Sequence, residues 1–365
     1  MLFSNVKPEI VLICGLVVGF FFGTYITRTT DPVKQIVMDR WCEQNDTKIQ
    51  ENDTGTSIIR PECPPDDFTE EKIRELNSDK LPVRNWTYGL DGICEGDDAK
   101  NCLESFIKLK EESNIYTATP AKFAFCTVRK SMSRILKQLS CMLTNPLNYL
   151  LAGHDLVDSA LTPGCLHFPN TTIHHVSEGE KLGWTKENGW IYILITREPI
   201  DRFISGYLHQ CVLGTPKDCK HNCYGCGANM TCFLEEVTKS LRKMYRVRDW
   251  ISTETDHLMP TNWFCDLYKT YDKFTFLKYN DDSGVFFKRQ LEPVLKKQNV
   301  SAEILTYIKR RMTSTRTLHS TNGFKLRSFL KDRILNSSYL TEMIVRLFYQ
   351  DFKAFNFTLP TPHDQ

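Results

Sequence analysis

The chain has 365 residues, of which 41% are hydrophobic, with 14 cysteines and a formal net charge of +2. This length and apolar content allow one sizeable hydrophobic core and argue against a chain that is disordered throughout. The near-neutral charge argues against a nucleic-acid-binding protein, because such proteins present a strongly basic surface to phosphates.

An uncharged, apolar segment at Ile10–Thr27 is the first predicted element. At a helical rise of ~1.5 Å per residue it covers roughly 27 Å, about one hydrocarbon thickness, which predicts a single transmembrane helix. A cleaved signal peptide is the alternative, but the segment is longer than a usual signal-peptide core and lacks a clear A-x-A-like cleavage site. We therefore expect a cytoplasmic tail at residues 1–9 and a transmembrane signal anchor at residues 10–27.

Cysteines and glycosylation sequons indicate where the rest of the chain lies. All cysteines except Cys14 follow the anchor, and disulfides form in the secretory pathway rather than in the cytosol. The sequence therefore predicts a single-pass type II membrane glycoprotein with a lumenal body. Because the number of lumenal cysteines is odd, one of them can stay free or can bridge two chains in a homodimer. N-x-[ST] sequons also follow the anchor, at Asn45, Asn52, Asn85, Asn170, Asn229, Asn299, Asn336 and Asn356.

Residues 28–120 are rich in charged and turn-forming residues and show weak hydrophobic periodicity. We interpret them as a lumenal stem with two local helices, at Glu70–Asn77 and Asn101–Glu111. Four cysteines are placed to staple this stem, in a connectivity that the sequence leaves open: Cys42, Cys63, Cys94 and Cys102.

Strand and helix patterns alternate between residues 121 and 358, which we expect to form a compact domain. Such alternation is typical of a three-layer α/β/α fold with a central parallel sheet. Strands are predicted at Ala121–Val128, Ile191–Thr196 and Phe274–Asn280, and helices at Ser133–Asn145, after Pro199, and at Glu303–Arg311, Leu326–Asn336 and Thr341–Phe355.

The turn Arg129–Ser133 (RKSMS) follows the first predicted strand and precedes a helix. Free backbone N–H groups and the positive end of the helix dipole favour an anion at such a place. Lys130 adds a charge, and Ser131 and Ser133 add hydroxyl donors. The alternative is that a serine caps the helix and Lys130 is solvated. A P-loop kinase is excluded because G-x-x-x-x-G-K-[ST] is absent.

A second basic turn follows the apolar run at residues 190–196. Arg197 can donate two hydrogen bonds to a phosphate, and Ser205, two helical turns further on, can reach the same anion. A structural ion pair is the alternative role for Arg197, but it does not explain the serine spacing. Arg202 is expected to pair with Asp201 or Glu198.

The spacing R-E-P-x-x-R-F-x-S-x-Y from Arg197 to Tyr207 resembles the segment by which carbohydrate sulfotransferases hold the 3′-phosphate of their donor, 3′-phosphoadenosine 5′-phosphosulfate. Glu198 replaces the aspartate usual in that family. The Lys130 turn is similar to the family's 5′-phosphosulfate loop, with Arg134 where a threonine is common.

This resemblance runs from about Lys122 to Phe357. It implies a P-loop-like sulfotransferase fold and a Golgi enzyme of the chondroitin and heparan 2-O-sulfotransferase type. Such an enzyme moves sulfate from 3′-phosphoadenosine 5′-phosphosulfate to a sugar hydroxyl. The acceptor implied is chondroitin, a related glycosaminoglycan or a glycoprotein glycan.

Sulfuryl transfer needs a base for the hydroxyl proton and charge stabilisation at the bridging oxygen, and it needs no metal. The resemblance places Lys130 at the bridging oxygen. Two histidines are candidates for the base. His175 is placed like the catalytic histidine of heparan 2-O-sulfotransferase, and His257 resembles a histidine near a tryptophan and a cysteine in the chondroitin branch. The sequence ranks them level.

A cysteine-rich insert follows the second turn, and its C-x3-C-x2-C-x5-C spacing is compatible with zinc. Lumenal cysteines more often form disulfides, so we favour disulfides. Two basic runs, Lys239–Arg248 and Lys309–Arg316, are candidate surfaces for a polyanionic acceptor. The insert contains Cys211, Cys219, Cys223, Cys226 and Cys232.

Two other functions remain open. A Golgi glycosyltransferase would share the anchor, stem and sequons, but the D-x-D that binds Mn²⁺ in most metal-dependent members is absent. A lumenal binding protein with the same fold could keep Arg197 and Ser205 and have lost the base. Donor binding without turnover would distinguish this second case.

Overall fold

The computed structural model describes residues 69–84, 92–108, 113–157, 172–212, 223–247, 252–314 and 325–361. The expected anchor at residues 10–27 lies outside these residues, as do Cys42, Cys63 and Cys219. Among the described residues, no helix combines the length and apolar character that a membrane crossing requires.

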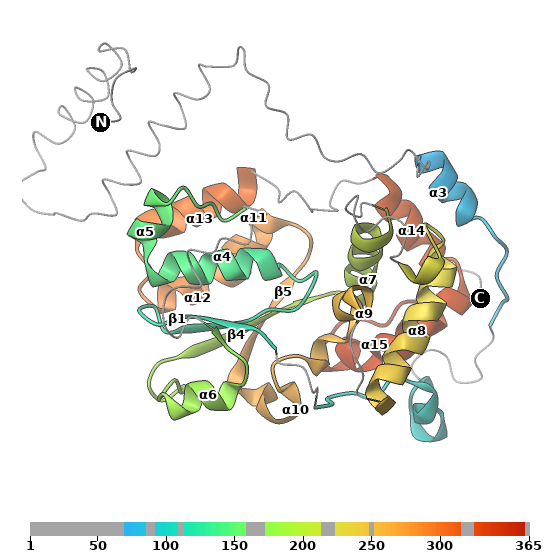
Figure 1. Ribbon diagram of the computed structural model, residues 1–365, viewed down its shortest axis with the longest axis horizontal. Helices are drawn as coiled ribbons and strands as arrows, with labels where there is room; N and C mark the ends of the chain where they lie inside the picture. The colour runs from blue at the N-terminus through green and yellow to red at the C-terminus, as the bar shows by residue number, and fades with distance from the viewer. Residues whose placement is uncertain are drawn as a thin grey trace, which may run out of the picture.

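A five-stranded sheet in the order β3-β1-β2-β4-β5 lies at the centre of the domain (Figure 1). Strands β2, β4 and β5 run parallel, as the sequence predicts, but β1 pairs antiparallel with both β2 and β3. The sheet is therefore mixed, which corrects the expected all-parallel sheet. The strands are β1 (Ile115–Ala118), β2 (Phe123–Cys126), β3 (Thr172–Ile173), β4 (Ile191–Arg197) and β5 (Phe274–Tyr279).

The reversal between β1 and β2 takes only the turn at residues 119–122, in which the N–H of Lys122 donates to the carbonyl of Thr119 at 3.1 Å. A connection this short joins only antiparallel neighbours, whereas parallel strands need a long crossover. Strand β1 also begins before Ala121, where the sequence placed the start of the domain.

Side chains of the central strands alternate between two hydrophobic cores, as the two-residue period of a strand requires. Phe125 and Ile193 face one core, and Ala124 and Leu194 face the other. Because helices line both cores, the expected three-layer arrangement is confirmed. The first core receives α4 (Ser133–Thr144), α5 (Pro146–Leu151), α11 (Ser283–Phe286), α12 (Glu292–Lys297) and α13 (Ala302–Ser314).

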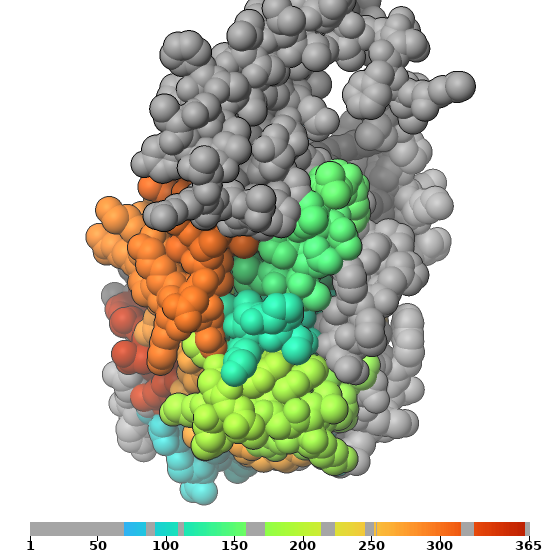
Figure 2. All heavy atoms as spheres, turned by 90° about the vertical axis from the view of Figure 1, so that its left-hand side faces the viewer, coloured from blue at the N-terminus to red at the C-terminus, as the bar shows by residue number. Residues whose placement is uncertain are grey.

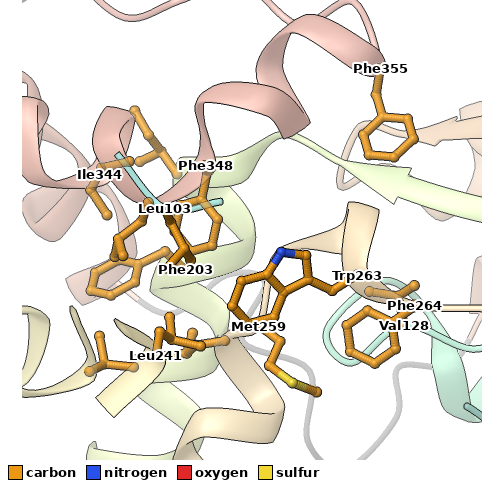
Figure 3. Close-up of a cluster of buried hydrophobic side chains, with 14 of the residues drawn as sticks. Leu103, Val128, Phe203, Leu241, Met259, Trp263, Phe264, Ile344, Phe348 and Phe355 are labelled. Atoms are coloured by element: carbon orange, nitrogen blue, oxygen red, sulfur yellow. The ribbon is translucent and has the colours of Figure 1, made fainter. Parts of the chain in front are cut away.

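The second core is the larger and contains Phe203, Trp263 and Phe348, which Figure 3 shows close together. Trp263 is buried, and its indole N–H donates to the carbonyl of Glu104 at 2.8 Å. The helices of this core are α6 (Val176–Lys181), α7 (Pro199–Tyr207), α8 (Met230–Val247), α9 (Thr253–Leu258), α10 (Leu267–Thr270), α14 (Lys325–Leu335) and α15 (Ser338–Ala354).

The amino ends of the parallel strands are closed by side-chain hydrogen bonds. Gln298, just after α12, donates to the carbonyl of Gly189 at 2.6 Å, and the Lys122 ammonium donates to that of Asn188 at 3.0 Å. Figure 2 shows this end of the molecule, with the orange α12–α13 region, the teal turn before β2 and the lime α6 region side by side. The basic turns lie at the opposite, carboxyl edge.

Parts of the expected stem pack onto the domain. The helix predicted at Glu70–Asn77 is present as α3 (Glu70–Leu76), and its Ile73 is 1% exposed. The Asn77 side chain donates to the carbonyls of Ile73 (2.7 Å) and Ala228 (2.8 Å) and accepts from the N–H of Met230 (2.8 Å). This amide therefore ties α3 to the start of α8.

The helix predicted at Asn101–Glu111 is wrong for the residues that the structure describes. A 3₁₀ helix spans Gly96–Asn101 instead, next to the Cys94–Cys102 disulfide. The backbone beyond it bonds to the domain rather than to itself: Leu103 donates to the carbonyl of Arg346 at 2.8 Å. Tertiary partners thus replace the local bonds that a helix needs.

Disulfides also cross-link segments of the domain. Two of them, Cys211–Cys223 and Cys226–Cys232, lie in the cysteine-rich insert, so the disulfide interpretation is confirmed for these four cysteines. A further disulfide, Cys126–Cys265, joins the end of β2 to the segment before α10.

Substitution of Asn77 by alanine should lower the free energy of unfolding by about 2–4 kcal/mol, because it leaves buried backbone groups of Ala228 and Met230 without partners. Denaturant unfolding of residues 29–365 measures the change. Lys72→Ala, at an exposed position of the same helix, is the control and should change stability by less than about 0.5 kcal/mol. Equal stability of the Asn77 variant and the wild type would show that α3 is not coupled to the domain.

Candidate active site

The two basic turns predicted from the sequence meet at the carboxyl edge of the sheet. Arg197 is the last residue of β4, and Lys130 follows β2, the strand paired with β4. The Arg197 guanidinium donates through Nη1 to the backbone carbonyl of Lys130 at 2.9 Å. One buried side chain therefore joins both candidate anion sites.

The Lys130 turn has an unusual backbone. Lys130 and Met132 have φ angles of 65° and 59°, in the left-handed region that costs a non-glycine residue about 1 kcal/mol or more. Met132 is the N-cap of α4 and makes no capping hydrogen bond, so Ser133 is the first helical residue and not the cap. The capping alternative is thereby contradicted for Ser133. The first N–H groups of α4 remain available at the turn.

Ser131 lies inside this turn and is 0% exposed. Its N–H donates to the carbonyl of Val128 at 3.1 Å, but its Oγ has no hydrogen-bond partner among the described residues. A buried hydroxyl without a partner carries a desolvation penalty of about 1–3 kcal/mol. An anion bound in the turn would supply the missing acceptor.

The Lys130 ammonium lies in a positive environment. The pKa of Lys130 is lowered to about 7. Burial is the largest cause, and the neighbouring guanidinium groups of Arg197, Arg134 and Arg129 act in the same direction. Arg129 itself donates to Asp256 Oδ2 at 2.8 Å. A bound anion would reverse this effect, because a nearby negative charge favours the ammonium form.

Arg197 is 6% exposed and forms an ion pair with Asp281, with Nη2 and Oδ1 2.6 Å apart. Asp281 also pairs with Arg327. The alternative role of Arg197, a structural ion pair, is therefore present in the structure. It leaves Arg197 Nε buried without a hydrogen-bond partner among the described residues. Burial lowers the pKa of Arg197, and Asp281 opposes that shift.

Helix α7 is organised differently from the expectation. Glu198 caps it by accepting from the N–H groups of Ile200 (3.1 Å) and Asp201 (2.7 Å), and burial raises the pKa of Glu198 to about 7. Arg202 pairs with neither acid: its Nη2 donates to the carbonyl of Met259 at 2.6 Å. The nearest carboxylate to Arg202 is distant in sequence, at position 351.

Ser205 lies two turns into α7 and is 4% exposed. Its predicted contact with the anion at Arg197 stays a prediction.

His175 leaves the sheet at the same edge as the two turns. Strand β1 is antiparallel to β2 and places Ile115 opposite Cys126, and β3 in turn places Ile173 opposite Ile115. The residues that follow β3 thus emerge beside the end of β2. His175 Nδ1 lies 3.0 Å from Oδ2 of Asp266, whose side chain is 10% exposed.

His257 lies in α9, which also borders the Lys130 turn through the Arg129–Asp256 contact. Its ring stacks on that of His209, with centroids 5.4 Å apart. Both histidine candidates are therefore near the turn. The side chain of His175 has a hydrogen-bonded carboxylate partner in Asp266.

Sequence reasoning missed three residues of this region: Asp266, Asp281 and Arg327. A signal existed for Asp281, which directly follows the β5 segment and so had to lie at the carboxyl edge with Arg197. No local pattern identifies Asp266 or Arg327, because their partners are remote in sequence.

The protein is an α/β domain in which two basic turns lie side by side at one edge of the central sheet. Residues 113–358 match the family model described as "Sulfotransferase family", and the chain belongs to that family. An uncharacterised protein of Caenorhabditis elegans is 30% identical over 293 residues, covering 80% of this chain and 81% of the relative.

Two other Caenorhabditis elegans proteins are similar over a comparable span. The protein vep-2 is 29% identical over 261 residues, which cover 71% of this chain and 80% of vep-2. The carbohydrate sulfotransferase chst-1 is 25% identical over 268 residues, which cover 71% of this chain and 79% of chst-1. No solved structure matches the chain.

Substitution of Ser131 by alanine should raise the free energy of unfolding of the ligand-free protein by about 1 kcal/mol, since it removes a buried hydroxyl without a partner. Ser140→Ala is the matched control. Its buried hydroxyl donates to the carbonyl of Thr117 at 2.8 Å, so its removal should destabilise the protein. Denaturant unfolding measures both variants, and loss of stability in Ser131→Ala would show that this hydroxyl is already satisfied.

Proposed function

We propose that this sulfotransferase transfers a sulfuryl group from 3′-phosphoadenosine 5′-phosphosulfate to a sugar hydroxyl. The observation that carries the proposal is the hydrogen bond from Arg197 to the Lys130 carbonyl, which joins two basic turns at one sheet edge. A donor with phosphate groups at two positions needs two such turns side by side. A glycosyltransferase is disfavoured by membership of the sulfotransferase family.

The residues at the edge fit that donor. Lys130, Ser131 and Ser133 would hold its 5′-phosphosulfate, and Arg197 and Ser205 its 3′-phosphate. The fit rests on two buried donors that have no partner among the described residues, Ser131 Oγ and Arg197 Nε. Each would gain an acceptor oxygen from the ligand, which removes a desolvation penalty as well as forming a charge-assisted hydrogen bond.

The transfer step assigns one role to each group. His175 takes the proton of the acceptor hydroxyl through Nε2 as that oxygen bonds to sulfur. The bond between sulfur and the bridging phosphate oxygen breaks, and its electron pair stays on the bridging oxygen, where Lys130 stabilises the charge. The products are a sulfate ester, 3′-phosphoadenosine 5′-phosphate and protonated His175. His257 is the alternative base.

The proposed acceptor is a glycan, in line with the name of chst-1, and a glycosaminoglycan such as chondroitin or a glycoprotein glycan is the class that we favour. The proposed location is the Golgi membrane, with residues 10–27 as the anchor and the domain in the lumen. Among the basic runs, Lys239 and Arg311 already pair with Glu236 and Asp155, which weakens both runs as acceptor surfaces.

Substitution of Arg197 by alanine should weaken binding of 3′-phosphoadenosine 5′-phosphate by about 100-fold or more, because it removes a buried charged donor. Thermal stabilisation of residues 29–365 measures binding, with uridine diphosphate plus Mn²⁺ as the competing ligand class. Arg289→Ala, an exposed arginine, is the control and should bind like the wild type.

Wild-type affinity in the folded Arg197 variant would show that the site is assigned wrongly. Stabilisation of the wild type by uridine diphosphate plus Mn²⁺, and not by 3′-phosphoadenosine 5′-phosphate, would favour a glycosyltransferase. Binding of 3′-phosphoadenosine 5′-phosphate without turnover on any desulfated glycan would favour a binding protein.

The affinity for 3′-phosphoadenosine 5′-phosphate should fall as the pH rises above 7, by up to about tenfold per pH unit. The reason is that Lys130, whose pKa is about 7, then loses its charge in the free protein. Lys130→Arg keeps a positive charge at every pH tested, so its affinity should change little between pH 7 and 8.5. Isothermal titration of 3′-phosphoadenosine 5′-phosphate measures both. The same pH dependence in both proteins would exclude Lys130 as its source.

A further inference from the structure

We propose that Asp266 is the positioning residue of the base His175, and that the Cys126–Cys265 disulfide fixes this pair beside the Lys130 turn. The inference rests on the proposed function and deepens it. It selects one of the two histidines by the structure around it.

The contact between the two side chains has the geometry of an oriented base. His175 Nδ1 and Asp266 Oδ2 are 3.0 Å apart, and the imidazole is 37% exposed while the carboxylate is 10% exposed. An ionised carboxylate can accept hydrogen bonds but cannot donate them, so Nδ1 carries the proton in this contact. The remaining nitrogen, Nε2, is then the proton acceptor in the neutral ring. That is the tautomer which a hydroxyl substrate requires.

The backbone that presents Asp266 is strained and held from several sides. Cys265 and Asp266 have φ angles of 52° and 57°, two successive left-handed residues without a glycine. Thr270 Oγ1 donates to both of their carbonyls, at 3.0 and 2.9 Å, and the N–H of Cys265 donates to Ser113 Oγ at 2.7 Å. Strained conformations that are over-determined in this way gather at functional sites.

Ser113 also anchors the histidine side of the pair. Its carbonyl lies 3.3 Å from His174 Nδ1, and the N–H of His174 donates to Glu178 at 3.1 Å. Ser113, just before β1, therefore contacts the residue that precedes each partner of the pair, His174 and Cys265. Lys269 follows on α10, where a side-chain hydrogen bond with Tyr268 and, to a lesser extent, the charge of Asp266 raise its pKa.

The disulfide connects this pair to the donor turn. Cys126 is the last residue of β2, and the chain runs directly from it into the turn that contains Lys130. Cys265 precedes Asp266, so the covalent link spans 139 residues and joins the carboxylate to the end of that strand. The base and the group at the bridging oxygen are thus mounted on one covalently closed unit.

Asp266→Asn is the decisive variant, because it keeps the shape of the side chain and removes the charge. We expect kcat to fall by at least about tenfold, toward the 10²–10⁴-fold loss expected for His175→Ala. Binding of 3′-phosphoadenosine 5′-phosphate should stay at the wild-type value, which also shows that the variant is folded.

Three further variants complete the test. Asp266→Glu should recover part of the lost kcat, and Asp272→Asn, an exposed aspartate nearby, should leave it unchanged. The double variant Cys126→Ala with Cys265→Ala should keep product binding and lose turnover.

A wild-type kcat in Asp266→Asn, alongside an inactive His175→Ala, would overturn the positioning role and leave the proposed function intact. Full activity of His175→Ala would overturn the pair and move the base to His257. Absence of 3′-phosphoadenosine 5′-phosphate binding by the wild type would reject the proposed function itself.

Discussion

A buried guanidinium joins the two halves of the site, and the other groups at the sheet edge are arranged around it. Arg197 ends the central strand β4, donates to the backbone of the Lys130 turn and pairs with Asp281. Burying one charge without a partner would cost several kcal/mol, which is why the Asp281 carboxylate is needed behind it. Asp281 in turn also pairs with Arg327. The two turns therefore keep their relative position before any ligand arrives.

This arrangement leaves an excess of positive charge on one side. Arg197 has a carboxylate behind it, whereas Lys130 is surrounded by other cations, which together with burial lower its pKa. The unmatched Ser131 hydroxyl and the left-handed turn add to the free energy of the empty site. A bound anion would offset the positive charge and accept a hydrogen bond from Ser131. A site built in this way is preorganised for its ligand at the expense of stability in its absence.

The parts that the sequence predicts correctly are those with a local signal. Strands β2, β4 and β5 and helices α4, α7 and α15 follow from hydrophobic periodicity, and the meeting of the two basic turns follows from strand order. Strand β1 was missed because it is short and paired through a tight turn. Arg202 was assigned to neighbouring acids, but its partners lie at Met259 and beyond, where burial and tertiary packing decide.

The contacts of the segments before β1 have a consequence for the order of folding during synthesis. Asp98 pairs with Arg346, 248 residues later in the chain, and Asn77 bonds to Ala228 across 151 residues. At a synthesis rate of about 5–20 residues per second, the first of these pairs waits roughly 10–50 s for its partner. These early-synthesised segments are thus among the last to dock, and their side chains remain without their native partners for that interval.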